Sequence, residues 1–489
     1  MTRHTRGTAA AAFPPDGSLS RAATRGFLQT FGGRTTALGL QFVAFGLLAS
    51  HLGPELLGVY TLALGLVVIF RVIPTFGFDP IVTREIAQRP ELEAELVPSI
   101  ALLRALLGAV SYGLLVVTLL VGGYDSRTTT AVLIAGGVLL LLWTETFRNS
   151  LSARLRLGWV AFADALEAVV TLVGIALLVT QNAGVHAFLW LYVAAKFVNS
   201  TIIVVTAIRV APPSGRLRFN LWRPMLLAAT PIGLAGILIT LYLTSGIVLL
   251  DRLKSAAEVG QFGAALRFFD VILLVPALIL GIVQPIFARS FLEPGEVLQR
   301  RFGRAVAFIV ILAVPISILG AMTASRVLPT IPGFHEYASA GTALAILAPA
   351  AGLSFLAAIV QSALLAGHQQ RSLLLTSFAG FVVNLVMLAL LVPAYGAYGA
   401  ASAITTTELV VVALSFAYAA RRLGLVLPLN RLVRLVPASV VLTVVLALGF
   451  MVHPFLQLGL GILAYTVALP LTGGISLREL AGVRPALSR

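Results

Sequence analysis

Four arginines interrupt long apolar stretches of this chain: Arg34, Arg71, Arg104 and Arg267. An ionisable side chain is costly inside hydrocarbon, and it usually faces a protein interior or a water-filled cavity. The guanidinium group stays charged, and its planar fork can bond two oxygen atoms of a pyrophosphate at once. Side chains of this type at such positions are therefore suited to hold an anion in an apolar environment.

An acidic neighbour would neutralise such an arginine and favour a structural ion pair, whereas an arginine without one is more available to bind an anion. Arg34 and Arg71 have no Asp or Glu within four residues, which favours a functional role. Arg267 has Asp270 three residues on, a helix neighbour, so an ion pair and an anion site are equally open. Arg104 lies about two turns from the predicted end of its helix, which favours a side chain that reaches the headgroups.

A second set of polar residues suggests ion pairs or ion coupling. Lys196 falls near the middle of an apolar stretch and needs a partner, for which Glu167 and Glu145 are the candidates. Such a pair is either a coupling switch or a plain structural ion pair, and the structural interpretation is slightly favoured. Glu408 is an unpaired acid in another apolar stretch and a candidate proton or sodium site. Gln41 shares one helical face with Arg34, so that face is polar.

The composition requires a membrane protein. Of 489 residues, 59% are hydrophobic and 11% are charged, and the mean hydropathy is +1.00. The apolar stretches are long and continuous, which indicates helices rather than a transmembrane β-barrel. The net charge of +15 is explained by arginines that flank the apolar stretches, so no nucleic-acid partner is expected. There is no cysteine, which excludes disulfides and thiolate metal sites.

About fourteen spans fit the hydropathy pattern, at roughly 20 residues per helix. They predict an all-α polytopic membrane protein with two six-helix lobes and two further helices at the C-terminus. The predicted organisation is a disordered cytosolic tail at 1–24, a first lobe at 25–208, a cytosolic linker at 209–223, a second lobe at 224–420, and the last two spans with a cytosolic C-terminus at 421–489.

The distribution of basic residues predicts the orientation. With the N-terminus inside, cytosolic segments hold about 25 of the 34 lysines and arginines, and the outer loops about 4. Both termini are therefore expected in the cytosol of a protein that spans the plasma membrane. The outer loops are short, so no large domain is expected outside.

The two lobes look like repeats. Gly58, Tyr60, Ala63, Leu64 and Pro74 match Gly260, Phe262, Ala265, Leu266 and Pro276 at one constant offset. Since six helices return the chain to the same side, the repeat is parallel, as in transporters that bind their substrate between two halves. Pro74 and Pro276 interrupt the helix ladder at matching positions, which suggests paired hinges.

Two segments resemble a known family. The sequences LGPELLGVYTLA, continued by GFDPIVTREIAQRPE, and DRLKSAAEVGQFGAALRFFD are similar to polysaccharide-biosynthesis flippases of the Wzx type. These belong to the multidrug/oligosaccharidyl-lipid/polysaccharide exporter (MOP) superfamily, and the resemblance covers nearly the whole chain. It implies fourteen helices in two lobes around a cavity that opens to one side at a time.

The resemblance also implies a substrate, a lipid-linked oligosaccharide on an undecaprenyl (pyro)phosphate carrier. Arg34, Arg71 and Arg267 are then expected to bind the phosphates together with Gln41. Membrane lipid and polysaccharide-assembly proteins are the other expected partners. The histidines lack metal-ligand spacing and no phosphate-binding glycine loop is present, so neither a metal, nor another cofactor, nor ATP hydrolysis is expected.

Two alternatives stay open. A drug/cation antiporter of the same superfamily would use cavity carboxylates, whereas the first two helices here carry arginines. A membrane glycosyltransferase or polymerase would need acidic residues and a sizeable outer loop. The chain is therefore interpreted as a flippase and not as an enzyme.

Overall fold

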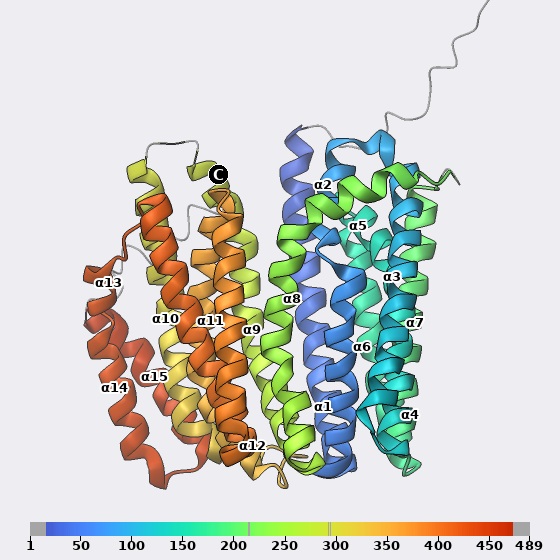
Figure 1. The fold of residues 1–489 in the computed structure, drawn as a ribbon. Coiled ribbons are helices and arrows are strands. Elements are labelled where there is room, and N and C mark those ends of the chain that lie inside the picture. Colours follow the sequence, from blue (N-terminus) through green and yellow to red (C-terminus); the bar gives the residue numbers. More distant parts are fainter. Residues whose placement is uncertain (1–15, 214–215, 292, 294, 473–489) are drawn as a thin grey trace, which may run out of the picture. The chain divides into compact units, whose positions relative to one another are not determined.

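The protein is almost wholly helical (Figure 1). The computed structural model describes residues 16–213, 216–291, 293 and 295–472, with side chains from residue 37 onward except at 277, 278, 281, 282 and 285. No β-strand occurs among these residues, and the predicted all-α fold is confirmed. The α-helices are α1 Asp16–Thr75, α2 Phe78–Gln88, α3 Glu93–Gly122, α4 Ser126–Gly136, α5 Glu145–Ala153, α6 Leu157–Thr180, α7 Val185–Val210, α8 Trp222–Leu253, α9 Ala256–Ser290, α10 Gly295–Val327, α11 Ala338–Ala366, α12 Gln370–Leu423, α13 Leu429–Val433, α14 Val436–Leu448 and α15 Pro454–Leu471.

Short 3-10 helices join or extend several of these elements. They are η1 Pro90–Leu92, η2 Gly137–Thr144, η3 Phe219–Leu221, η4 Leu328–Thr330 and η5 Gly449–Met451. η2 lies between α4 and α5, so these three elements form one continuous span, Ser126–Ala153. α1 begins at Asp16, whereas the tail was predicted to reach residue 24, and residues 1–15 lie outside the described part of the chain.

Twelve helical stretches in the described residues are long and apolar enough to cross a membrane. Two of them, Ala37–Gln88 and Gln370–Leu423, have 52 and 54 residues, far more than one crossing needs. Each contains a glycine with non-helical backbone angles, Gly53 with φ 66° and Gly396 with φ 53°. Glycine adopts positive φ without a steric penalty, so the chain can bend there. Counting each of these stretches as two spans gives the predicted fourteen.

The described residues fall into two compact units. Unit 1 contains the chain up to Leu48 and then Leu66–Ile237, and unit 2 contains Ala49–Gly65 and the chain from Leu238 onward. The bounds of these units differ from the predicted lobes at 25–208 and 224–420. Ala49–Gly65 lies in the predicted first lobe but belongs to unit 2, and unit 1 continues to Ile237, beyond the predicted start of the second lobe. The lobe boundaries stay a prediction.

Unit 1 is built from α2 to α7 with the first half of α8 and most of α1. Its apolar core includes Phe78 of α2, Ile100 of α3 and Leu151 of α5. Gly108 of α3 lies directly against the backbone of η2, where a Cβ atom would overlap the carbonyl group of Leu139. This close approach accounts for a glycine in the interior of α3.

Unit 2 is organised around α11, which packs against α9, α10 and α12 (Figure 1). α11 is rich in alanine, and small side chains let helices in a membrane approach closely. The two C-terminal helices, α14 and α15, pack on α10 through a core that includes Phe302, Leu442 and Tyr465. The predicted two additional spans therefore belong to this unit.

The segment Ala49–Gly65 is part of unit 2 although the residues before and after it belong to unit 1. A Cβ atom on Gly260 would lie 3.0 Å from the backbone nitrogen of Gly58 and closer still to the carbonyl oxygen of Pro54. The Tyr337 hydroxyl donates to the Ala49 carbonyl at 2.9 Å, and burial, together with the charge of Glu336, raises the pKa of Tyr337. The glycines at matching positions of the proposed repeat thus pack backbone to backbone.

Candidate functional site

Arg71 is an exposed side chain on the membrane-spanning part of α1. Four residues later the helix ends at Thr75, whose hydroxyl donates to the Arg71 carbonyl at 2.9 Å. The chain then turns at Phe76 and Gly77, with φ values of 26° and 70°, before α2 begins at Phe78. A Cβ on Gly77 would lie 2.7 Å from the backbone nitrogen of Gly233, so this turn requires glycine.

Asp79, at the start of α2, is shared by several polar side chains of unit 1. Its Oδ1 accepts a hydrogen bond from Arg104 at 2.5 Å and another from Asn149 at 3.0 Å. Arg71 also interacts with Asp79 electrostatically. Its charge is therefore not isolated, although the local sequence suggested that it was. One carboxylate therefore faces two guanidinium groups, and the set carries a net charge of +1, with Arg71 as its exposed cation.

Arg104 is completely buried, at 0% exposure, which contradicts the expectation that it reaches the headgroups. Its guanidinium carbon lies 5.4 Å from the centre of the Phe78 ring. Its Nε and one terminal nitrogen have no hydrogen-bond partner. The ion pair outweighs snorkelling because α2 and α3 both pack on α5, and Asp79 at the start of α2 lies within reach of Arg104.

Two further ion-pair groups join α5, α6 and α7 in unit 1. Arg148 contacts Glu145 at 3.0 Å and Asp164 at 2.9 Å, and it donates to Asn199 at 2.8 Å. Asn199 in turn donates to Asp164 at 3.0 Å.

Lys196 Nζ lies 2.6 Å from Glu167 Oε1. Of the two partners considered from the sequence, the structure brings Glu167 to Lys196, while Glu145 contacts Arg148. Glu167 is nearly buried, whereas the Lys196 side chain is about one third exposed. The geometry is that of an ion pair, and a coupling role for it stays a prediction.

Of the other three predicted anion-binding residues, the structure describes the side chains of two. The backbone of Arg34 lies in α1, but its side chain is outside the described part of the structure. Gln41 is half-buried in the same helix. In unit 2, Arg267 is half-buried on α9, and Asp270 is exposed one turn later and interacts with it electrostatically.

Glu408 of unit 2 is buried, at 3% exposure, and the Tyr242 hydroxyl donates to it at 3.0 Å. The sequence suggested an acid without a partner, and the structure supplies this tyrosine from α8, 166 residues away. Next to Glu408 in the chain, the Thr407 hydroxyl accepts a hydrogen bond from Asn384 at 3.3 Å. The Asn384 carbonyl oxygen is buried without a hydrogen-bond partner, so unit 2 contains a small buried polar region with spare acceptor capacity.

The matching prolines are both buried. Pro74 lies one residue before the end of α1, and the break in the helix occurs at Phe76 and Gly77 rather than at the proline itself. Pro276 lies in α9, whose hydrogen-bonded helix extends to Ser290. A hinge role for either proline stays a prediction.

Asp79, Asp164 and Tyr242 are the residues that the sequence reasoning missed. Asp79 follows the left-handed turn at Gly77, and its partner Arg104 lies 25 residues further along the chain, beyond the reach of local spacing. Asp164 lies one turn before Glu167 in a largely apolar span, which was a usable signal for an intramembrane partner of Arg148. Among the described residues, no group of three or more His, Asp or Glu side chains is arranged to hold a metal ion.

Comparisons with known proteins agree on the fold. The lipid II flippase MurJ in an inward closed conformation is similar with a TM-score of 0.74 and 13% identity, over 93% of this chain and 99% of that chain. An inward-facing multidrug resistance MATE family transporter of the MOP superfamily has a TM-score of 0.58 and 15% identity, over 80% and 94% of the two chains. The Vibrio cholerae MATE transporter VcmN in the bent form has a TM-score of 0.57 and 15% identity, over 83% and 98%.

Sequence comparison identifies the family, whereas the similar structures show only the fold. A search of curated protein sequences found no match. A family model described as polysaccharide biosynthesis protein matches residues 23–291, more than half of the chain. The predicted resemblance is confirmed: the chain belongs to the polysaccharide biosynthesis protein family.

Proposed function

We propose that this protein is a flippase that moves a lipid-linked oligosaccharide, carried on undecaprenyl (pyro)phosphate, across the cytoplasmic membrane by alternating access. The observation that carries the proposal is the charge around Asp79. The ion pair with Arg104 already neutralises this carboxylate, and the exposed Arg71 remains as a net positive charge within a membrane-spanning stretch. Hydrocarbon cannot accommodate such a charge, so Arg71 faces water or an anionic ligand.

A phosphate group fits this requirement better than the cationic drugs of the alternative antiporter. The side chain that is exposed is a cation, and the acids of unit 1 are largely occupied by arginine or lysine partners. A guanidinium fork can take two phosphate oxygens. Arg34 and Gln41, which belong to unit 1 like Arg71, are proposed to bind a second phosphate and the first sugar. Arg267 of unit 2 is proposed as a further phosphate ligand.

Glu408 is proposed to couple transport to an ion gradient. A carboxyl group buried beside a neutral tyrosine hydroxyl, rather than beside a cation, can change its charge by taking up a proton or sodium ion. Replacement of Glu408 by glutamine keeps the hydrogen bond to Tyr242. Transport by this variant should then no longer respond to an imposed proton or sodium gradient, and an unchanged response to both would refute the assignment.

Pro74 and Pro276 are proposed as bending points for the movement between the inward-open and outward-open states. Each removes one helix hydrogen bond beyond an intramembrane arginine. Replacement of both by alanine should slow turnover with little effect on substrate binding. A double variant that transports at the parental rate would argue against the hinges.

The orientation can be tested because the chain has no cysteine of its own. Asn182 lies in the exposed turn between α6 and α7, and Arg156 lies in the exposed connection between α5 and α6. With both termini in the cytosol, a cysteine at 182 should react with a membrane-impermeant maleimide in intact cells, and a cysteine at 156 only after lysis. The reverse pattern would invert the proposed orientation.

The decisive experiment measures transport of a defined lipid-linked oligosaccharide in proteoliposomes. Arg71→Ala should reduce the rate at least tenfold because the phosphate loses its guanidinium partner, and Arg71→Lys should recover only part of the loss. Arg84→Ala, which removes an exposed arginine on α2, is the matched control and should transport normally. If Arg71→Ala is produced at the parental level and transports at the parental rate, the proposed phosphate site is wrong.

A further inference from the structure

The residues between α7 and α8 include a short segment that is rich in both arginine and bulky apolar side chains. Arg216–Arg223 has the sequence RLRFNLWR and contains no acidic residue. We call this segment the linker strap. It includes η3 and the first two residues of α8.

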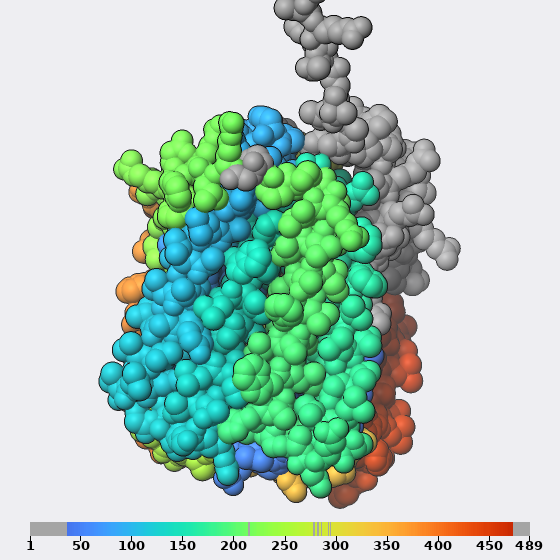
Figure 2. Space-filling view, turned by 90° about the vertical axis from the view of Figure 1, so that its right-hand side faces the viewer, coloured from blue at the N-terminus to red at the C-terminus, as the bar shows by residue number. Residues whose placement is uncertain are grey.

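The linker strap is fastened to the beginning of α3. The backbone N–H of Arg218 donates to the Ser99 hydroxyl at 2.8 Å, and the Trp222 indole donates to the Ser99 carbonyl at 2.9 Å. The Arg218 guanidinium lies 2.5 Å from Glu95. Figure 2 shows the light-green strap lying over blue residues at this end of unit 1. Three bonds to two residues thus hold the strap in place and determine which of its side chains remain outside.

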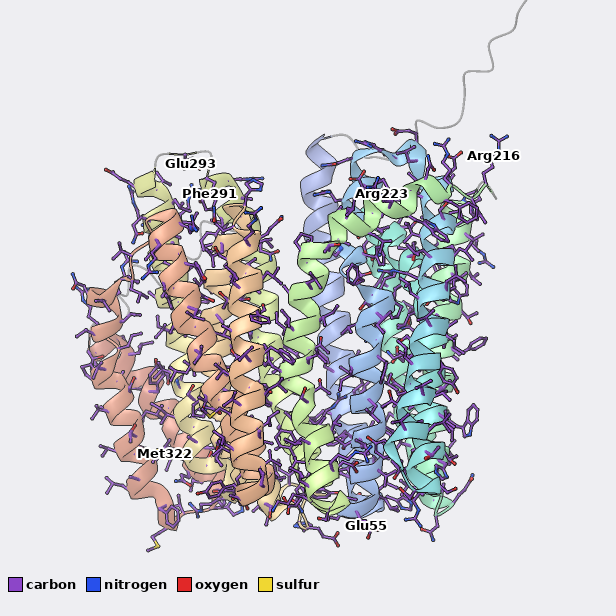
Figure 3. All side chains as sticks on the ribbon, in the orientation of Figure 1. Glu55, Arg216, Arg223, Phe291, Glu293 and Met322 are labelled. Carbon is purple, nitrogen blue, oxygen red and sulfur yellow. The ribbon has the colours of Figure 1, made fainter. Side chains whose placement is uncertain are left out.

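The side chains that remain outside combine two opposite properties. Leu217 is 44% exposed and Phe219 is 59% exposed, and the Phe219 ring packs edge-on against Trp222 at 5.0 Å between centroids. Arg216 and Arg223 are exposed at the same end of unit 1 (Figure 3). Water alone suits the arginines but leaves the apolar side chains without a favourable environment.

The surrounding charge is strongly positive. Arg209, in the last turn of α7, is also exposed, so the segment from 209 to 223 carries four arginines and no acid. Glu95 of α3 pairs with Arg218 of the strap. The segment itself thus contributes only positive charges to the connection between two membrane-spanning helices.

The position of the strap identifies what covers it. The connection joins the candidate membrane spans Val185–Val210 and Phe219–Leu253, so the strap lies at the ends of two such helices, where an interface with lipid headgroups is expected. Aromatic side chains prefer this interface, and arginines there attract anionic headgroups. We propose that the linker strap is a binding surface for anionic phospholipid headgroups, with Leu217 and Phe219 inserted beside the acyl chains and the arginines on the phosphates.

This surface is distinct from the proposed transport site, because Arg71 and its partners take no part in it. Since Ser99 and Glu95 also belong to α3, bound lipid would hold the start of α3 and the start of α8 in one arrangement. The strap would then make the conformation of unit 1 depend on the lipid composition of the leaflet that covers it.

The test uses a cysteine at Asn220, an exposed residue of the strap, labelled with an environment-sensitive fluorophore. The protein is reconstituted in vesicles of phosphatidylcholine that contain an equal amount of headgroup-quencher-labelled phosphatidylglycerol or of similarly labelled phosphatidylcholine. Quenching by phosphatidylglycerol should be several-fold stronger. Arg216→Gln with Arg223→Gln should abolish this difference while transport activity and folding are retained.

The matched control removes two exposed arginines elsewhere, by Arg431→Gln with Arg434→Gln on and next to α13, and it should preserve the difference. Equal quenching by the two lipids, or a preference that survives loss of Arg216 and Arg223, would overturn the proposal. Displacement of phosphatidylglycerol by soluble inorganic pyrophosphate at moderate ionic strength would assign the surface to a free anion instead. Protection of the cysteine in native membranes but not in vesicles of either composition would assign it to a protein.

Discussion

The two units stabilise their interiors by different means. In unit 1, ion pairs connect the helices: Arg104 with Asp79, Arg154 with Glu93, Arg148 with Asp164, and Lys196 with Glu167. In unit 2, helices approach through glycine and alanine, and the buried acid Glu408 accepts a hydrogen bond from a tyrosine.

This difference has consequences for function. A buried ion pair is costly to separate, because each partner left alone is an uncompensated charge. The helices joined by these pairs are therefore expected to stay together during transport, while unit 1 presents the surplus cation Arg71. A buried carboxyl beside a neutral partner can change its protonation without breaking an ion pair, so unit 2 is the better place for coupling. The comparison can be tested by removing the characteristic contacts of each unit.

The largest effect is expected when Arg104 loses its partner. Asp79→Leu leaves a guanidinium group at 0% exposure without a counter-charge, which should cost roughly 3–5 kcal/mol of unfolding free energy. Denaturant titration of the purified protein in detergent measures this loss. The double variant Asp79→Leu with Arg104→Met removes both charges and should regain most of the stability. A single variant as stable as the parent would show that unit 1 does not depend on this pair.

The next effect concerns the backbone contact between Gly58 and Gly260 in unit 2. Gly260→Ala places a methyl group against the Pro54 carbonyl and should destabilise the protein by roughly 1–3 kcal/mol. Gly459→Ala, in α15 with nothing within 4 Å, is the control and should be neutral or slightly stabilising, because alanine favours helix. Equal thermal denaturation curves for both variants would mean that close packing is not what holds unit 2 together.

A smaller and asymmetric effect is expected at Lys196 and Glu167. Lys196→Met leaves the nearly buried Glu167 carboxylate alone and should cost about 1–2 kcal/mol, since the pair is only partly buried. Glu167→Gln should cost less, because the Lys196 ammonium is partly exposed and can reach water. The same denaturant titration compares the two variants, and a larger loss for Glu167→Gln would reverse the assignment of the buried partner.

The smallest effect is expected for an ion pair at the surface of unit 2. Arg301 contacts Glu293 at 2.9 Å, but both side chains are more than one third exposed. Arg301→Gln should therefore change the unfolding free energy by less than about 1 kcal/mol, and salt should abolish even that difference. A loss as large as that of Asp79→Leu would remove the distinction between the two units.

Much of the fold follows from the sequence alone. The apolar stretches are long enough for a bilayer and separated by polar connections, so the number and order of spans can be predicted without tertiary contacts. The recurring glycines and the two quoted segments were sufficient to indicate the family. These features are local in the sequence, and hydrophobic length decides them.

The partners of the polar residues could not be predicted in this way. Arg71 was considered isolated because no acid lies within four residues, yet Asp79, beyond the turn at Gly77, interacts with both Arg71 and Arg104. Glu408 lacked a local partner for the same reason, since Tyr242 comes from another helix. Inside a membrane, hydropathy determines which segments cross, but helix packing determines which side chains face each other. Charge compensation between distant helices is therefore decided only by the tertiary structure.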